Sequence, residues 1–441
     1  MRPAARLQAV IETLDAVEEG IQNLGSPADR VVADYCRKRR FIGSKDRRAI
    51  SALAYDVIRR RGFHVWRVSG AKLPIDGRSM LISQLTATAS DDLNLFGDTA
   101  PHSPAPLTEF EQNAIVDFGA LKSDNTIPVS ARYELPEFLE PALRQRFGAD
   151  LDNALAALNE AAPLDIRANP IKQDQSLNKD LIKILEDIEK TEYSSIGYRS
   201  RRKARVTESD LYTSGKIEVQ DEAAQLACYL VEAQPSMAVI DLCAGAGGKS
   251  LLLSGLMKNK GQIFAFDVSS KRLSALSARS QRAGSRNIQI KVIPEVGSNR
   301  ERVLSGLSGK ADRVVVDAPC WGTGTGRRNP DQRWRLSEKQ ITDYAAVQLD
   351  LLSEGARLVA PGGRLIYMTC SLLQEENESV VDAFFAAHGT TDWKLLNYKS
   401  VWSDVLSSEP AETTAKNQAM LQLVPHLHQT DGFFVAIMEK T

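Results

Sequence analysis

The segment Ala238-Val-Ile-Asp-Leu-Cys-Ala-Gly-Ala-Gly-Gly-Lys-Ser250 joins an apolar run to a glycine-rich turn and then to a helix-like stretch. A buried strand, a turn and a helix in this order are typical of a doubly wound α/β domain. Glycines let the backbone approach a ligand, and amides at a helix start can bind an anionic group. The glycines do not have the spacing of a Walker phosphate-binding loop, so this turn is not a P-loop. The segment instead predicts a site for an adenosine-containing cofactor, with a plain tight turn as the alternative.

The remainder of the chain from residue 219 onward alternates strand-like and helix-like segments. Candidate strands are 238–242, 262–267, 288–293, 313–317, 364–368, 393–397 and 432–438, with helices such as 249–257 and 269–283 between them. This spacing predicts a doubly wound parallel sheet of the Rossmann-like α/β class. Ligands bind beyond the carboxyl ends of such strands, where Asp267 is placed to bind ribose hydroxyls.

The first 218 residues lack this alternation and divide into two predicted parts. Residues 1–125 carry apolar side chains at helical spacing and predict an all-helical domain. Residues 126–218 predict a small α+β region that presents basic residues, with helices at 139–147, 150–159 and 174–188 and a strand at 163–169. We therefore expect three domains, 1–125, 126–218 and 219–441.

The charge of the chain is unevenly distributed, although the formal net charge is only −1. Basic side chains cluster in four runs, at 36–48, 59–61, 198–205 and 327–328. Basic patches with interleaved aromatic residues are typical of surfaces that bind a phosphate backbone. Solvated helix faces are the alternative for any one run, but four runs in one chain favour RNA or DNA as a partner.

The composition excludes several classes of protein. With 441 residues, 43% hydrophobic and 25% charged, the chain is ordinary globular material. Five cysteines are too few for a disulfide framework, and without a CxxC pair a structural zinc site is not expected. No stretch is apolar enough to span a bilayer, and the N-terminus has no signal-peptide pattern. We expect a cytoplasmic monomer without a bound metal.

Two cysteines directly follow predicted strands. Cys320 lies in Asp317-Ala-Pro-Cys320-Trp-Gly-Thr-Gly-Thr-Gly326, and Cys370 lies in Thr369-Cys-Ser371. Residues 372–377 after Cys370 form a plausible helix start, whose amides would favour the thiolate. Either cysteine could instead be core filler, since free cysteine is often buried. Because strand ends meet at one edge of the sheet, the cofactor turn and both thiols are expected to share a crevice.

These motifs, in this order, resemble those of the RNA (cytosine-5)-methyltransferase family, the Nol1/Nop2/Sun group. The matching stretches are Asp241–Ser250, Asp267–Leu273, Asp317–Cys320, Thr369–Ser371, Val219–Gln225, Arg327–Trp334 and Asp431–Ala436. The helical region, with Asp46-Arg-Arg48 and Val57-Ile-Arg-Arg60, is similar to a NusB-like RNA-binding domain. The resemblance spans nearly the whole chain and points to 16S ribosomal RNA, or a precursor of the small subunit, as the partner.

The resemblance implies S-adenosylmethionine as the cofactor and a role for each thiol. Cys370 is expected to add to C6 of the cytosine, Cys320 to assist release of the product, and Asp317 to bind the base at N3. The expected cofactor-binding residues are Cys243, Ala244, Gly245, Ala246, Gly247, Gly248, Lys249, Asp267, Arg272, Glu295 and Asp317.

Three positions depart from the family pattern. Ala246 stands where a proline is usual, and Trp321 stands where a small residue is common. Trp321 could stack on a nucleobase or fill the loop. The family's third cofactor-facing acid has no clear aspartate here, and Glu295 is the nearest candidate.

Two other functions are compatible with parts of the sequence. A DNA cytosine-5 methyltransferase would use the cysteine of its Pro-Cys motif, here Cys320. A non-catalytic RNA-binding assembly factor would need only the basic patches. Methylation of an amino group is disfavoured because its Asp/Asn-Pro-Pro-aromatic motif is absent.

Overall fold

The computed structural model describes residues 1–120, 127–172, 176–202 and 204–441, which form two compact units. The first unit comprises Met1–Gln145, Ala149–Glu160 and Gly326–Ser337, and the second comprises Arg146–Gly148, Ala161–Thr325 and Glu338–Thr441. The predicted boundary between residues 125 and 126 lies outside the described residues. The division into three domains stays a prediction.

The first unit is built from helices, as the periodicity predicts. They are α1 (Pro3–Gln22), α2 (Ala28–Lys38), α3 (Ser44–Arg59), α4 (Arg61–Gly70), α5 (Gly77–Ala87), α6 (Glu109–Ala120), α7 (Val129–Arg132), α8 (Glu140–Phe147, whose last two residues fall in the second unit) and α9 (Leu151–Asn159). The apolar faces of α1, α3, α5 and α6 meet in one core that contains Leu14, Ile50, Met80 and Phe118. Burial of these faces, rather than helix propensity alone, stabilises the unit.

A segment from the second half of the chain completes this unit. Gly326–Ser337 belongs to it, although both of its flanks belong to the second unit. Asp331 Oδ2 accepts a hydrogen bond from the backbone N–H of Ala28 (3.0 Å), and Arg335 donates to the carbonyl of Ser26 (2.7 Å). Arg333 is half-buried and donates to the carbonyl of Glu134 (2.6 Å). The segment is therefore part of the packing of the helices.

The second unit opens with a small antiparallel sheet in the order β2-β3-β1-β4. Its strands are β1 (Leu164–Ala168), β2 (Glu189–Lys190), β3 (Gly197–Ser200) and β4 (Ile217–Val219), with helices α10 (Leu177–Ile184) and α11 (Asp210–Thr213). Residues 174 and 175 of the helix predicted over 174–188 lie outside the described residues, and α10 ends four residues early. Within the predicted basic run 198–205, Arg199 is buried and donates a hydrogen bond to Asp165 at 2.7 Å. Its charge is therefore paired inside the small sheet and is not part of a basic surface.

The larger sheet has the order β10-β12-β9-β8-β5-β6-β7, with β11 paired to β12. Its strands are β5 (Ala238–Asp241), β6 (Gln262–Asp267), β7 (Ile288–Val292), β8 (Ala311–Asp317), β9 (Val359–Thr369), β10 (Trp393–Leu396), β11 (Leu421–Leu423) and β12 (Phe433–Lys440). Strands β5 to β9 are parallel, but β12 is antiparallel to β9. The Rossmann-like class is confirmed, and the prediction of a wholly parallel sheet is wrong because an apolar run carries no information on strand direction.

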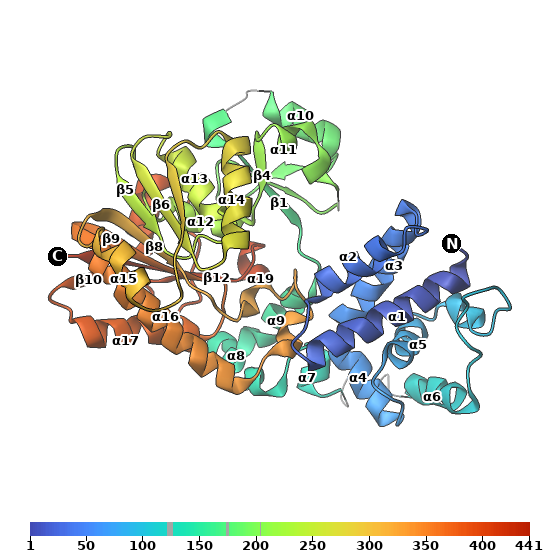
Figure 1. The fold of residues 1–441 in the computed structure, drawn as a ribbon. Coiled ribbons are helices and arrows are strands. Elements are labelled where there is room, and N and C mark those ends of the chain that lie inside the picture. Colours follow the sequence, from blue (N-terminus) through green and yellow to red (C-terminus); the bar gives the residue numbers. More distant parts are fainter. Residues whose placement is uncertain (121–126, 173–175, 203) are drawn as a thin grey trace. The chain divides into compact units, whose positions relative to one another are not determined.

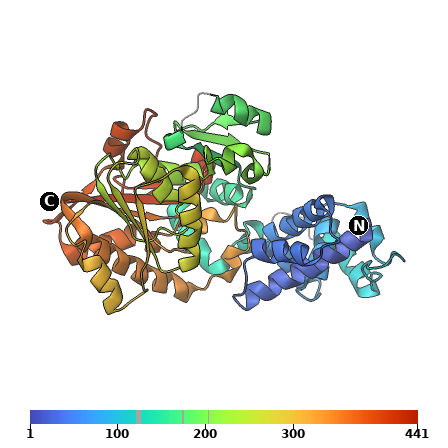
Figure 2. The same cartoon turned by 45° about the horizontal axis from the view of Figure 1, so that its top comes forward.

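Helices cover both faces of this sheet (Figures 1 and 2). They are α12 (Glu222–Tyr229), α13 (Gly248–Leu256), α14 (Ser270–Ala283), α15 (Ser298–Ser305), α16 (Glu338–Leu358), α17 (Glu378–His388), α18 (Tyr398–Val405) and α19 (Pro425–His428). Alternate strand residues enter different cores: Val315 packs with α12 and α13, whereas Val314 and Val316 pack with α16 and α17. This alternation buries the strands on both sides, as expected for a doubly wound sheet. No helix among the described residues is long and apolar enough to cross a membrane.

Candidate active site

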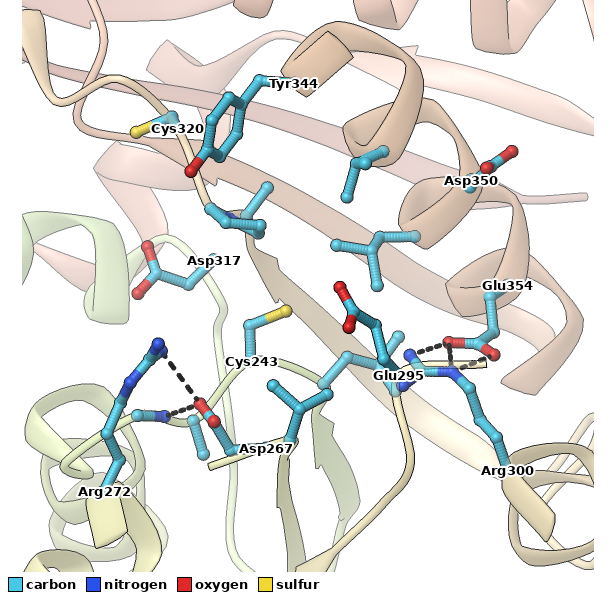
Figure 3. A pocket seen from close by; sticks show the side chains of 18 of the residues that line it. Cys243, Asp267, Arg272, Glu295, Arg300, Asp317, Cys320, Tyr344, Asp350 and Glu354 are labelled. Carbon is cyan, nitrogen blue, oxygen red and sulfur yellow. Dashed lines mark hydrogen bonds and ion pairs between the residues drawn. The ribbon is translucent and has the colours of Figure 1, made fainter. Parts of the chain in front are cut away.

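A cavity of about 1550 Å³ lies at the carboxyl ends of the parallel strands (Figure 3). It gathers the residues that sequence analysis singled out, from the loops after β5, β6, β7, β8 and β9. Those that line it are Cys243, Ala244, Gly245, Ala246, Gly248, Lys249, Asp267, Arg272, Glu295, Asp317, Cys320 and Cys370. Gly247 is the one predicted residue that does not line the cavity. The expected shared crevice therefore exists.

The glycine-rich turn leaves room above its backbone. A Cβ added at Gly245 would meet nothing closer than 4.0 Å, and one at Gly248 nothing closer than 3.7 Å. Both glycines face the cavity at the start of α13. A ligand can thus approach the main chain where a side chain would otherwise stand, which fits an adenosine-containing cofactor.

Gly247 is required by conformation rather than by contact with a ligand. Its φ is +83°, and a Cβ there would lie 2.0 Å from Leu276 Cδ1. We expect Gly247→Ala to lower the free energy of unfolding by about 1–3 kcal/mol, the usual cost of such backbone strain. Cofactor affinity should fall with it because the turn must shift. Urea unfolding and calorimetric titration with S-adenosylmethionine check this, and wild-type values in both would contradict it.

Asp267 shapes the turn from the end of β6. Its Oδ2 accepts the N–H of Gly245 (2.9 Å), and its Oδ1 accepts the N–H of Ser269 (2.7 Å). Arg272 approaches the same carboxylate at 3.5 Å. Asp267 is 4% exposed, at the wall of the cavity, and Glu295 lies on the same wall after β7. Both carboxylates therefore line the same cavity as the glycine-rich turn, and their role in binding a ribose stays a prediction.

Asp317 and Lys249 form an ion pair beside the thiols. Lys249 Nζ lies 2.6 Å from Asp317 Oδ2 and 5.0 Å from the centre of the Phe433 ring. Although burial opposes its charge, the Asp317 carboxylate raises the pKa of Lys249. The lysine therefore stays charged and holds the Asp317 carboxylate at the carboxyl end of β8. The sequence pattern places Lys249 in the cofactor turn but carries no signal for its pairing with Asp317, which lies 68 residues further along the chain.

The two cysteines lie next to each other, with Sγ atoms 3.4 Å apart. Hydrogen bonding to Cys370, together with burial, holds the pKa of the Cys320 thiol well above its usual range. The predicted helix start over 372–377 is partly correct: Gln374–Glu376 form a single turn of 3-10 helix, and α17 follows from Glu378.

Trp321 is a loop residue rather than an open stacking platform. It is 8% exposed, and its ring lies 5.2 Å from that of Tyr344. Of the two roles that the sequence left open, the structure favours filling the loop. Ala246 lies in the open part of the turn and lines the cavity.

One wall of the cavity was missed in the sequence. It comes from α16, which presents Tyr344, Val347, Leu351 and Glu354. These residues recur at intervals of three and four, a signal of one helix face that was available but left unassigned. Glu354 accepts a hydrogen bond from Arg300 at 2.8 Å, which joins α16 to α15 (Figure 3).

Asp241, at the end of β5, gives the site a pH-dependent contribution to stability. Burial raises its pKa from 3.8 to about 6, although Ser250 Oγ donates to its Oδ2 at 2.6 Å. The folded pKa exceeds the unfolded one, so this contribution is present below about pH 4 and is lost as pH rises through about 6.

We therefore expect the stability of Asp241→Asn relative to wild type to increase with pH. About two pKa units correspond to a relative change of roughly 3 kcal/mol. Urea unfolding of both proteins at about pH 4.5 and about pH 7 measures most of it. A difference that does not change with pH would contradict the prediction.

The fold and the site together define an S-adenosylmethionine-dependent methyltransferase. The sequence profile of the family described as 16S rRNA methyltransferase RsmB/F matches residues 228–439. The probable ribosomal RNA small subunit methyltransferase B of Synechocystis sp. is 32% identical over 320 residues, covering 71% of this chain and 68% of that protein. This chain belongs to the 16S rRNA methyltransferase RsmB/F family.

Solved structures agree with this placement. The crystal structure of PH0851 covers 100% of this chain and 99% of its own, with a TM-score of 0.76 and 25% identity. The structure of NSun6 from Pyrococcus horikoshii with SFG, an analogue of S-adenosylmethionine, covers 69% of this chain and 98% of its own. Its TM-score is 0.59 at 20% identity, so it supports the fold alone.

Proposed function

We propose that this protein methylates C5 of a cytosine in 16S ribosomal RNA through a covalent bond between Cys370 and C6 of the base. The observation that supports this most is the pair of adjacent thiols, 3.4 Å apart, at the cavity that also holds the glycine-rich turn. A DNA cytosine-5 methyltransferase that uses its Pro-Cys cysteine needs only one of the two thiols, and methylation of an amino group needs neither. The proposed reaction uses both.

The chemistry follows from the weakness of C5 as a nucleophile. When the Cys370 thiolate adds to C6, electron density moves to C5 and towards N3. When bound, S-adenosylmethionine supplies an electrophilic methyl group. Asp317, held by Lys249, is placed to bind the base at its N3 edge, and the proton that leaves the Cys370 thiol can pass through this carboxylate to N3, where it neutralises the arriving charge. The cytosine must leave any stack to reach these groups.

Cys320 completes the cycle. After C5 is methylated, its proton must leave while the Cys370–C6 bond breaks and the ring regains its double bond. Cys320 Sγ lies 3.4 Å from Cys370 Sγ, so a Cys320 thiolate would stand close enough to the adduct to take this proton.

The helical unit offers a surface for RNA. The stretch that joins α2 to α3, with the adjoining ends of both helices, exposes Arg37, Lys38, Arg40, Lys45 and Arg48, with Phe41 72% exposed among them. Cationic side chains around an exposed aromatic ring suit phosphate contacts and base stacking. We propose that this surface positions the RNA and that the cavity performs the reaction.

Mapping of 5-methylcytosine tests the proposed function. 16S RNA from cells with and without the gene is compared by bisulfite sequencing, and the purified protein is then offered unmodified 16S RNA, its assembled subunit and duplex DNA. One cytosine should lose its methyl group without the gene and regain it in vitro on an RNA substrate only. Methylation of the DNA would favour the alternative enzyme, and cofactor binding without any transfer would favour the assembly factor.

A further inference from the structure

Glu376 lies between the loops that carry the two thiols. It is fully buried in the turn Gln374–Glu376. Its Oε1 accepts the backbone N–H of Trp321 (3.0 Å), the residue after Cys320. Its Oε2 accepts the hydroxyl of Ser371, the residue after Cys370. One carboxylate thus holds the neighbours of both thiols.

Gln348 extends this hold to the other side of Cys320. From α16, its Nε2 donates to Glu376 Oε1 (3.0 Å) and to the carbonyl of Pro319 (2.9 Å). The backbone immediately before and after Cys320 is therefore tied to the same carboxylate group. Since Gln348 is itself buried, solvent does not compete for these bonds.

Direct bonds between the loops leave them little independent movement. The N–H of Gly324 donates to the carbonyl of Cys370 (2.9 Å), and the N–H of Leu372 donates to Thr323 Oγ1 (2.8 Å). The Glu376 carboxylate adds a bond at the residue that follows each thiol, Trp321 in one loop and Ser371 in the other. Its removal would loosen the part of each loop that sets where the sulfur atoms lie.

A buried carboxylate lowers the stability of a fold unless its hydrogen bonds compensate for the loss of water. Burial raises the pKa of Glu376, which reflects the cost of removing its charge from water. An apolar side chain would avoid this cost but could not accept bonds from two loops at once. Glu376 does not line the cavity, so contact with the substrate does not account for it.

We propose that Glu376 is a positioning residue that sets the separation and orientation of the Cys320 and Cys370 thiols. The inference rests on the proposed function in one respect: both sulfurs must reach the same cytosine, Cys370 at C6 and Cys320 at the proton on C5. Reaction geometry is demanding, and a displacement of about 1 Å can lower turnover by about 100-fold.

The first test measures thiol proximity without any catalysis. Diamide oxidises two adjacent thiols to a disulfide and takes up their two hydrogens, and peptide mass mapping identifies the Cys320–Cys370 link. We expect Glu376→Ala to form this link about 10-fold more slowly than wild type, since effective concentration falls steeply with misplacement. The matched control is Glu375→Gln at the exposed neighbouring glutamate, which should react at the wild-type rate.

The second test measures turnover on unmodified 16S RNA. Glu376→Ala should lower kcat by about 100-fold while KM for RNA and affinity for S-adenosylmethionine stay at wild-type values. Glu376→Gln keeps one acceptor oxygen and the side-chain volume, so it should restore kcat to within about 10-fold of wild type. Partial rescue of this kind is expected of a positioning role.

Two results would overturn the proposal. One is a wild-type cross-linking rate in Glu376→Ala. The other is loss of cofactor affinity and melting temperature in proportion to kcat, which marks a purely structural residue. If Glu376→Ala does not fold, Gln348→Met carries the test, since it removes the bonds to Glu376 and Pro319, and a wild-type cross-linking rate in this variant would count against the proposal. The two proposals can fail separately. If the protein methylates no RNA but the variants still cross-link more slowly than wild type, the proposed function is refuted while the positioning of the thiols by Glu376 stands.

Discussion

Replacing Cys370 with alanine is expected to abolish methyl transfer. Loss of a covalent nucleophile lowers kcat on the order of 10⁴-fold or more. No covalent protein–RNA species should form, because C6 would have no thiolate to accept. Binding of S-adenosylmethionine should persist, since the glycine-rich turn and Asp267 are unchanged. Transfer of a labelled methyl group and denaturing gels with 5-fluorocytosine RNA measure both effects.

Cys228→Ala is a useful control for this experiment. Its thiol is also buried in the second unit but does not line the cavity, so its loss should leave turnover near wild type. Measurable turnover by Cys370→Ala would show that the nucleophile is misassigned. If Cys320→Ala instead abolished turnover, Cys320 would be the nucleophile, as in a DNA cytosine-5 methyltransferase that uses the cysteine of its Pro-Cys motif.

The variant Cys320→Ala is expected to behave in the opposite way. Addition to C6 and methylation of C5 still proceed, but the C5 proton lacks its base. The Cys370–C6 bond therefore persists, and a protein–RNA complex that resists denaturation should accumulate in the presence of S-adenosylmethionine. We expect kcat to fall by about 10²–10⁴-fold, the usual contribution of a general base.

Mass spectrometry distinguishes this outcome from a simple loss of activity. The complex should carry the extra methyl group on the trapped cytosine and should vanish in the double variant with Cys370→Ala. Efficient multiple turnover by Cys320→Ala, with no retained complex, would remove Cys320 from the mechanism.

The sequence contained most of what places the cavity. Apolar runs ended by glycine, proline or aspartate predicted where the strands end. In a parallel sheet these carboxyl ends lie along one edge, which is where the cavity is found. Asp267, Asp317, Cys320 and Cys370 were found in this way. The antiparallel direction of β12 was not, because alternation along a strand is the same in either direction.

Features that depend on distant contacts were out of reach. Glu376 looked like part of a helix start, and its buried role depends on residues 321 and 348, far away in the chain. Arg199 looked like part of a basic surface, but Asp165 draws it into the small sheet. The sequence shows that a side chain is charged, but whether that side chain is buried depends on a partner that the fold brings from elsewhere in the chain.

The packing of Gly326–Ser337 with the helices has a consequence for dissecting this protein. A cut after residue 218 would yield two pieces, neither of which contains a whole folding unit. The amino-terminal piece would lack Asp331 and Arg335, which bond residues 26 and 28. The other piece would carry an orphaned peptide between its Cys320 loop and α16. Insertions or deletions tolerated at a true domain border should therefore destabilise this protein, and the two units are best studied within the intact chain.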